Sequence, residues 1–206
     1  MSTRSRIGIK RTDGSIKMIY CHSDGYFSHN GRVLLAHHDT LKHAEALVSQ
    51  GDMSVLGEVI GTKHDFDWIM NFPDNAQGHI DWDGVRADPR NKMCRFYMRD
   101  RGEKGLKAEV YPSLAAASGA FEEYLYLWDI ARGCWIATAT CYEDVAELKW
   151  FALADLKDAG FLVEGNHDDP SDSGTPSIDY DLFPASALPD ADETKMNTVL
   201  EGLHSF

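Results

Sequence analysis

Apolar and polar positions alternate on both sides of a short turn near the start of the chain. The alternation covers residues 7–9 and resumes over 16–20, with Asp13 and Gly14 between the two runs. An Asp-Gly pair between alternating runs is a strong hairpin signal, because glycine accepts the positive φ that the turn requires. The chain is therefore predicted to open with a β-hairpin.

Helical spacing of apolar residues follows the hairpin. It predicts a short helix over 33–38 and a second one over 41–50, which Asp39 or Thr40 caps and Gly51 ends. The widest apolar stripe runs through 114–128 and predicts a long helix capped by Ser113. A last helix is expected over 144–159, ending at Gly160.

Strand patterns return at 93–99 and 134–142, whereas 64–91 shows no sustained period. We interpret 64–91 as a long ordered loop or insertion, because its apolar residues require burial: Phe66, Trp68, Ile69, Met70 and Phe72. The order of elements predicts an α+β fold, an antiparallel sheet that opens with a β-hairpin and is packed by three to four helices. One domain is expected over 1–163, followed by an acidic, proline-containing tail over 164–206.

Charge is unevenly distributed along the 206 residues. The formal net charge is −13, of which −9 falls in 164–206 and only −4 in 1–163. A surface that wraps nucleic acid needs a surplus of lysine and arginine, so direct nucleic-acid binding is not expected. The tail serves solubility or presents carboxylates to a partner, and its candidate partner-facing residues are Asp168, Asp169 and Asp172.

No apolar run is long enough to span a membrane, and no signal-peptide core follows the N-terminus. We therefore expect a cytoplasmic protein without membrane contact. The cysteines form no close pair and are expected to be free, mostly buried thiols rather than disulfides or zinc ligands: Cys21, Cys94, Cys134 and Cys141.

The chain lacks the phosphate-loop, dinucleotide, serine-hydrolase and paired-cysteine zinc motifs. Its most distinctive polar segment is a loop after the hairpin whose candidate binding residues are Tyr20, His22, Asp24, Tyr26, His29 and Asn30. Three interpretations stay open for this loop. It is a hydrogen-bonded turn, a ligand- or partner-binding loop, or a divalent-metal site formed by His22, Asp24 and His29.

Two further clusters carry candidate functional groups. Arg4, Arg99 and Arg101 are candidates for anion binding, although Asp100 and Glu103 are close enough in sequence to neutralise the last two. On the expected helix over 114–128, Glu122 and Tyr126 lie off the apolar stripe and are candidates for a partner-facing patch.

Four segments together resemble a family of small, largely uncharacterised bacteriophage and prophage proteins. The resemblance rests on TRSxIxI at 3–9, IYCHxDGYxxHNG at 19–31, RDRGE at 99–103 and EEYxYL at 122–127. The family pattern has tryptophan where this chain has Ser23 and glycine where it has Ser2. The resemblance implies no catalytic residues.

A phage origin favours a protein that binds and inhibits a host factor, such as a defence nuclease or CRISPR effector, in the host cytoplasm. The acidity of the chain agrees with an anti-CRISPR or anti-restriction inhibitor that offers carboxylates where phosphates bind. No cofactor is expected in that case. The alternatives are a metal-dependent hydrolase or nucleotide-processing enzyme with a divalent metal at the loop, and a nucleotide-binding module without turnover.

Overall fold

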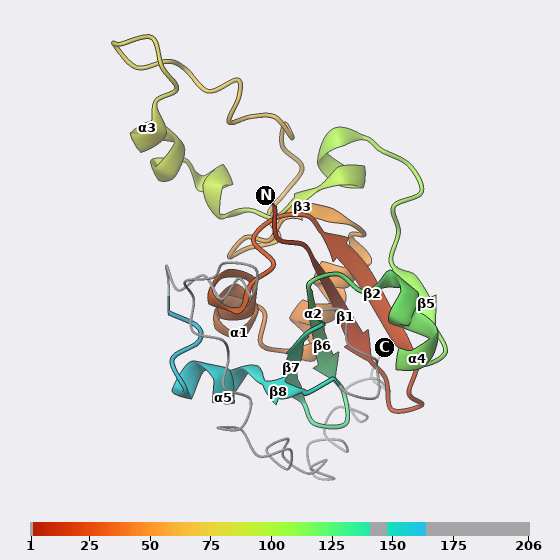
Figure 1. The fold of residues 1–206 in the computed structure, drawn as a ribbon. Coiled ribbons are helices and arrows are strands. Elements are labelled where there is room, and N and C mark those ends of the chain that lie inside the picture. Colours follow the sequence, from red (N-terminus) through yellow and green to blue (C-terminus); the bar gives the residue numbers. More distant parts are fainter. Residues whose placement is uncertain (1, 141–147, 164–206) are drawn as a thin grey trace.

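The computed structural model describes residues 2–140 and 148–163, and it confirms the α+β class (Figure 1). In this part of the chain one sheet contains eight strands. They are β1 (Ser5–Lys10), β2 (Ile16–Cys21), β3 (Met53–Val55), β4 (Arg95–Phe96), β5 (Glu109–Tyr111), β6 (Tyr124–Asp129), β7 (Cys134–Ala139) and β8 (Phe151–Ala152).

The sheet is mixed rather than wholly antiparallel. Its order is β4-β3-β2-β1-β6-β7-β8, with β5 pairing with β2 off this path. β1 runs antiparallel to β2 but parallel to β6, and β2 runs parallel to β3. The chain makes a long excursion before it returns as β6, and such a crossover allows parallel pairing where a tight hairpin does not.

The predicted hairpin is confirmed. β1 and β2 pair along their whole length, and Gly14 has a φ of +84° at the turn. The Gly14 N–H donates to the Arg11 carbonyl at 3.0 Å, and the Ser15 N–H donates to the Asp13 carboxylate at 2.9 Å. The turn chemistry of Asp-Gly therefore fixes the register of the first two strands.

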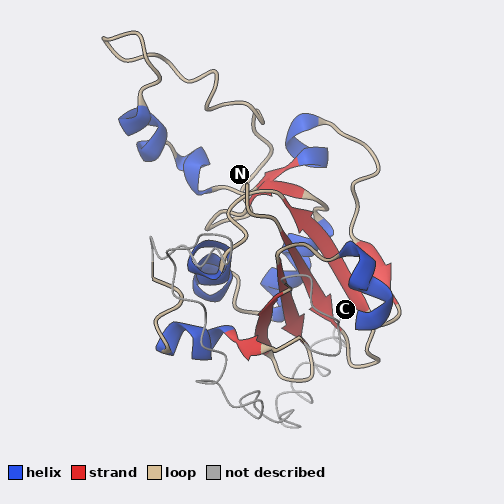
Figure 2. Ribbon diagram, in the orientation of Figure 1, coloured by secondary structure: helices blue, strands red, loops and turns tan. Residues whose placement is uncertain are grey.

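Helices cover both faces of the sheet, and Figure 2 shows α4 beside β5, apart from α1 and α5. The hydrophobic core consists of two clusters of buried side chains. The larger cluster packs α1, α2 and α5 against one face of the sheet, and the smaller cluster packs α4 against the opposite face. The helices are α1 (Arg32–His37), α2 (Leu41–Ser49), α3 (Trp82–Ala87), α4 (Leu114–Ala117) and α5 (Leu153–Asp158). Shorter helical turns are η1 (Phe27–Gly31), η2 (Pro89–Lys92), η3 (Tyr97–Arg101) and η4 (Ser118–Ala120).

The helices predicted over 33–38 and 41–50 are confirmed as α1 and α2. The hydroxyl of Thr40 accepts the N–H of His43 at 3.1 Å, which is the predicted cap, and Gly51 has a φ of +83° beyond the end of α2. The predicted strand over 93–99 is only partly confirmed, because β4 ends at Phe96 and the chain continues as η3.

The long helix predicted over 114–128 is wrong. Ser113 does cap α4, but α4 and η4 end at Ala120, and 124–129 is strand β6, buried at all six positions. β6 lies between β1 and β7 with both faces covered, so its sequence is a continuous apolar run that also matches helical spacing.

Near the end of the described residues the predictions are confirmed in part. The strand predicted over 134–142 is present as β7, whereas 141 and 142 lie outside the described residues. Within the helix predicted over 144–159, Phe151–Ala152 form β8, α5 begins at Leu153, and Gly160 follows with a φ of +86°. Residues 144–147 and the acidic tail over 164–206 lie outside the described residues.

Residues 62–93 leave the body of the molecule as an extension, hereafter the arm, which carries α3 and η2 (Figure 1). The prediction of an ordered segment without sustained period agrees with this structure. The expected burial holds for Trp68, which is 2% exposed, but is wrong for Met70, which is 74% exposed. A short arm has too little volume to enclose all its apolar side chains.

A close backbone approach at Gly8 gives a test of the β1–β2 pairing. A Cβ atom at Gly8 would lie 2.6 Å from the Lys17 carbonyl oxygen and 2.7 Å from the Met18 Cβ. We expect Gly8→Ala to lower the free energy of unfolding by about 1–3 kcal/mol in urea denaturation. Gly119→Ala is the matched control, because nothing lies within 4 Å of its Cβ position. Equal stability of the two variants would contradict this account.

Candidate functional site

The loop between β2 and α1 is held from beneath by Asn30, which is completely buried. Its amide nitrogen donates to the Ser5 hydroxyl at 3.0 Å, and its amide oxygen lies 3.0 Å from the His29 Nδ1. The same amide nitrogen lies 3.5 Å from both the Cys21 sulfur and the Ser23 carbonyl. Asn30 therefore joins β1, β2 and the loop, which is the role of a hydrogen-bonded structural turn.

Gly25 explains how the loop packs so closely on the N-terminal segment. Its N–H donates to the Thr3 carbonyl at 2.9 Å, and a Cβ atom would lie 2.6 Å from the Arg4 carbonyl oxygen. The preceding residue, Asp24, has a positive φ of 56°, a conformation that aspartate tolerates better than most residues. The Asp-Gly pair thus brings the loop against residues 3–4.

This approach creates a polar cluster at the beginning of β1, hereafter the Tyr20 cluster. It comprises Arg4, Arg6, Tyr20, His22, Glu122 and Glu123. Arg4 Nε donates to the Tyr20 hydroxyl at 3.1 Å, and that hydroxyl lies 2.8 Å from His22 Nδ1. Arg6 is directly opposite Tyr20 in the hairpin, and its guanidinium lies 5.4 Å from the centre of the tyrosine ring.

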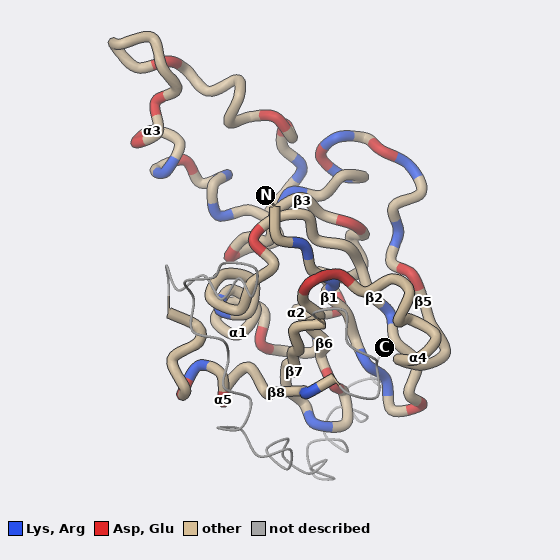
Figure 3. Tube along the Cα trace, in the orientation of Figure 1, with Lys and Arg blue, Asp and Glu red and all other residues tan. Residues whose placement is uncertain are grey.

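Opposite charges in the Tyr20 cluster compensate one another, and Figure 3 shows acidic and basic positions side by side where β1 begins. An oxygen of Glu122 lies 3.7 Å from the Arg6 guanidinium, and an oxygen of Glu123 lies 4.0 Å from the Arg4 guanidinium. Burial raises the pKa of Glu122, and the charge of Arg6 opposes this shift. An anion would therefore have to compete with two glutamates for these arginines.

The Tyr20 cluster has a limited chemical repertoire. The hydrogen bond between Tyr20 and His22 is a path for proton exchange, but burial raises the pKa of Tyr20 and so disfavours the phenolate. Arg6 Nε is buried without a hydrogen-bond partner among the described residues.

The other residues of the loop make separate contacts. The Tyr26 hydroxyl donates to the Asp24 carboxylate at 3.1 Å, and burial, followed by the charge of Asp24, raises the pKa of Tyr26 to about 12. Within 2–140 and 148–163 no three histidine, cysteine or acidic side chains form a group that could hold a metal ion. The alternative set of His22, Asp24 and His29 is therefore not brought together as a metal site.

The RDRGE segment forms a structural clamp at the base of the arm. Arg99 donates to the carbonyls of Cys94 and Ile60 at 2.7 and 2.8 Å and to Asp100 at 2.7 and 2.9 Å. The Asp100 carboxylate also accepts the N–H groups of Phe96 at 2.8 Å and His64 at 3.2 Å. The anion-binding prediction for Arg99 is corrected, because its guanidinium is already engaged by these groups.

Arg101 has a weaker, more exposed environment. It lies 3.4 Å from Glu103, and its guanidinium is 5.1 Å from the centre of the Phe66 ring. The three candidates for anion binding belong to different structures. Arg4 is part of the Tyr20 cluster, whereas Arg99 and Arg101 lie at the clamp and beside it.

The partner-facing prediction for Tyr126 is wrong. Its side chain is completely buried in β6, and its hydroxyl donates to the Gly25 carbonyl at 2.6 Å. The prediction assumed a helix, in which Tyr126 lies outside the apolar face. In the structure the same residue lies in a central strand whose two faces are both covered, so its side chain is in the core. Glu122 lies at the Tyr20 cluster, and Asp168, Asp169 and Asp172 lie outside the described residues.

The cysteine prediction is confirmed for Cys21 and Cys94, which are buried free thiols. Burial raises the pKa of Cys21 to about 12 and that of Cys94 to about 11, so neither is a thiolate at neutral pH. Cys21 lies beside His22 in sequence, but its sulfur faces the Ser23 carbonyl and Asn30.

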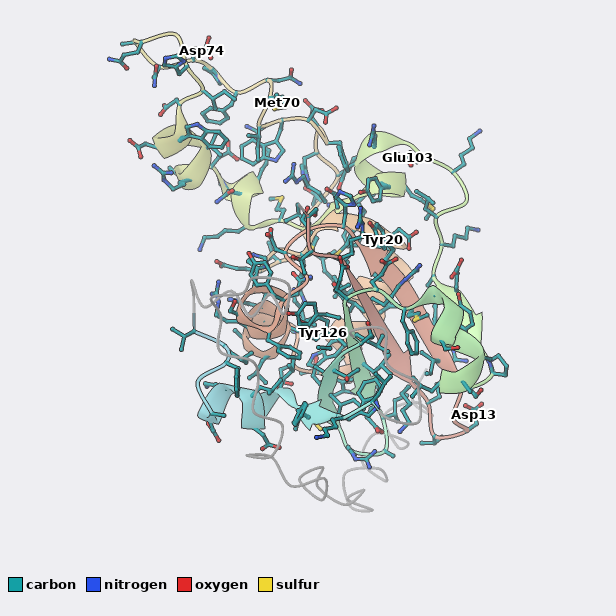
Figure 4. The ribbon with its side chains drawn as sticks, in the orientation of Figure 1. Asp13, Tyr20, Met70, Asp74, Glu103 and Tyr126 are labelled. Atoms are coloured by element: carbon teal, nitrogen blue, oxygen red, sulfur yellow. The ribbon has the colours of Figure 1, made fainter. Side chains whose placement is uncertain are left out.

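The arm coincides with the segment 64–91 that the sequence marks as a long ordered loop or insertion, but its outward path from the body is visible only in the structure (Figure 1). Trp68 is its centre, with the Arg90 guanidinium 4.6 Å from its ring and the Phe72 ring 5.8 Å away in an edge-to-face arrangement. In Figure 4, Met70 and Asp74 lie on the arm, far from Tyr126 in the core. Met70 is 74% exposed and Trp82 53% exposed. The sequence signals of this segment are the lack of period over 64–91 and its apolar residues, which predict an ordered insertion but not its direction.

Comparisons with protein-family models, with curated proteins and with solved structures find no match. The resemblance to phage proteins therefore rests on the four motifs alone. Across the described ranges, no helix is both long and apolar enough to cross a membrane.

The clamp gives a pH-dependent prediction. Burial alone would raise the pKa of Asp100, but hydrogen bonds from Arg99, Phe96 and His64 hold it below its ordinary value of 3.8. The carboxylate therefore stabilises the fold above pH 4, and this contribution is lost as the pH falls through the lowered pKa. We expect Asp100→Asn to lower the free energy of unfolding at pH 7 by about 3 kcal/mol. Between pH 5 and pH 2, the free energy of unfolding of this variant should vary less with pH than that of the wild type.

The matched control for the clamp is Glu103→Gln, which removes one partner of the exposed Arg101 pair. Its effect on stability is expected to be below about 1 kcal/mol, because solvent screens such pairs. Denaturant titrations at each pH measure both variants. If Asp100→Asn lowered the free energy of unfolding no more than Glu103→Gln does, the stabilising role of the Arg99–Asp100 clamp would be refuted.

Asn30 provides the test of the loop as a structural turn. We expect Asn30→Ala to lower the free energy of unfolding by about 2 kcal/mol, because Ser5 loses a buried partner and a cavity forms. Asn91→Ala, at an exposed position of the arm, is the control. Equal stability of Asn30→Ala and the wild type would contradict the structural role of this side chain.

Proposed function

We propose that this chain is a phage-encoded accessory protein that binds and inhibits a host factor in the host cytoplasm. A defence system is the proposed target, so the protein is an inhibitor of the anti-CRISPR or anti-restriction type. The observation that carries the proposal is the arm, and the phage origin rests on the resemblance of the four motifs.

The arm exposes apolar side chains to water, which is unfavourable unless a binding partner covers them. It exposes Met70 and Trp82 to solvent, and its apolar contacts around Trp68 form mainly within the arm itself. It is nevertheless fixed to the body by the buried Arg99–Asp100 pair and its hydrogen bonds to Ile60 and His64. Exposed methionine and tryptophan side chains on a fixed scaffold are typical of protein–protein contacts.

The state of the motif side chains supports binding over catalysis. Asn30 and Arg99 are engaged in the structure itself, and the arginines of the Tyr20 cluster are matched by glutamates. The alternative of a metal-dependent hydrolase or nucleotide-processing enzyme needs His22, Asp24 and His29 at one metal and free arginines beside it. The described residues give that alternative no gathered ligand set.

A plaque assay tests the proposed function. Host strains that carry a restriction system or a CRISPR effector are challenged with a sensitive phage while the protein is expressed. We expect the wild type to raise plaque formation and Met70→Ser/Trp82→Ser to abolish the rise, because the exposed contacts are lost. Val110→Ser is the matched control, since Val110 is a 58% exposed apolar residue on β5, away from the arm.

A second variant separates the arm from the tail. Asp168→Asn/Asp169→Asn/Asp172→Asn neutralises three tail carboxylates in the full chain, and we expect it to retain activity if the arm makes the decisive contact. If only the tail variant lost activity, the decisive contact with the host factor would be assigned to the tail instead of the arm. The proposed inhibitory function would be refuted if the wild type raised plaque formation in none of the defence-carrying strains and bound no host protein.

A further inference from the structure

We infer that the arm docks on a positively charged surface of another protein, of the kind that holds nucleic-acid phosphates. This inference rests on the proposed function and specifies the chemistry of the partner. Met70 and Trp82 supply the apolar contact, and Asp65, Asp67 and Asp74 supply the charges that meet lysine and arginine side chains.

The arm has an excess of unpaired acids. The arm has four lysines and arginines, and three of them are held by acids of the chain itself: Arg86 lies 2.6 Å from Asp83, Arg90 lies 2.7 Å from Asp88, and Lys92 lies 3.1 Å from Glu58. The fourth, Lys63, is exposed and makes no ion pair within the described ranges, so three unpaired acids stand against one unpaired cation. Asp65, Asp67 and Asp74 are exposed and make no ion pair within the described ranges. Figure 3 shows acidic positions spaced along the arm.

These three acids flank Met70 in sequence, whereas Trp82 lies farther along the chain, at the beginning of α3. Asp65 and Asp67 precede Met70, and Asp74 follows it beyond the end of the turn over 66–71. Asp65 accepts the Asn71 side-chain amide at 3.0 Å, and this hydrogen bond lowers the pKa of Asp65, so the carboxylate stays ionised. An apolar centre with charged surroundings is the usual composition of a specific protein interface.

The arm is pre-organised for docking. Trp68 is packed between Arg90 and Phe72, Val85 is 3% exposed, and the Asp81 carboxylate caps α3 by accepting the Gly84 N–H at 3.1 Å. A segment that already holds its shape loses little conformational entropy when it binds. The Arg99–Asp100 clamp serves the same purpose at the base.

Charge also selects the occupant. The tail of this chain has a net charge of −9 and a second copy has −13, so both are repelled by the acidic arm. Nucleic acid and anionic membranes are repelled for the same reason. A basic protein surface is attracted, and the carboxylates of the arm take the positions of phosphates on it.

Photo-crosslinking in the full-length chain tests this inference. A photoreactive amino acid replaces Met70 in one variant and Val110 in the matched control, and both proteins are expressed in host cells. We expect a host protein crosslinked at position 70 and not at 110, with the crosslinked peptide in a surface rich in lysine and arginine. A crosslink to a second copy, to an acidic or neutral surface, or equally from both positions would overturn the inference.

Salt dependence of binding provides the second measurement, with the crosslinked partner in purified form. We expect Asp65→Asn/Asp67→Asn/Asp74→Asn to weaken binding about tenfold at low salt and to reduce its salt dependence. The control, Asp13→Asn/Glu45→Gln/Asp158→Asn, neutralises three exposed acids of the body and is expected to bind like the wild type. Equal weakening by both triple variants would overturn the inference.

The experiments distinguish a failure of the proposed inhibitor function from a failure of docking by the arm. A host protein that is bound and inhibited through position 110 or the tail leaves the proposed function intact and refutes docking by the arm. A chain that crosslinks to no host protein and protects no phage refutes both.

Discussion

The central position of β1 is the constraint on which the rest of the structure depends. All six residues of β1 pair with β2 on one side and with β6 on the other. Ser5 is therefore beside Cys21 and Tyr124, and the segments before β1, after β2 and before β6 have to meet at one place. That meeting place contains the Asn30 hydrogen bonds, the Gly25 approach to Arg4 and the Tyr20 cluster.

This convergence gives the four motifs a shared physical explanation. Residues 3–9, 19–31 and 122–127 supply β1, the loop with its buried Asn30, and the beginning of β6 with its buried Tyr126. Residues 99–103 contain the Arg99–Asp100 pair that fixes the base of the arm. The motifs thus describe how the scaffold is built, and the arm, which contains none of them, is the segment that the scaffold presents.

Electrostatics separates the body from the arm in the same way. In the body, three buried or half-buried acids are matched: Asp100 by Arg99, Asp129 by Lys10 and Arg132, and Glu122 by Arg6. Matching is required there because an unpaired charge in a low-dielectric environment is strongly unfavourable. On the arm, water solvates the exposed acids, so unpaired carboxylates cost little and remain available to a partner.

Local chemistry is sufficient to predict the Asp-Gly hairpin, the helix capped by Thr40, and the ends at Gly51 and Gly160, and the order of the elements predicts the α+β class. That 124–129 is a central strand follows from packing, since a strand covered on both faces has the same continuous apolar run as a helix. The tertiary structure also decides which polar residues meet. Arg6 and Glu122 are far apart in the chain, and their proximity follows from the parallel pairing of β1 with β6, which no local pattern encodes.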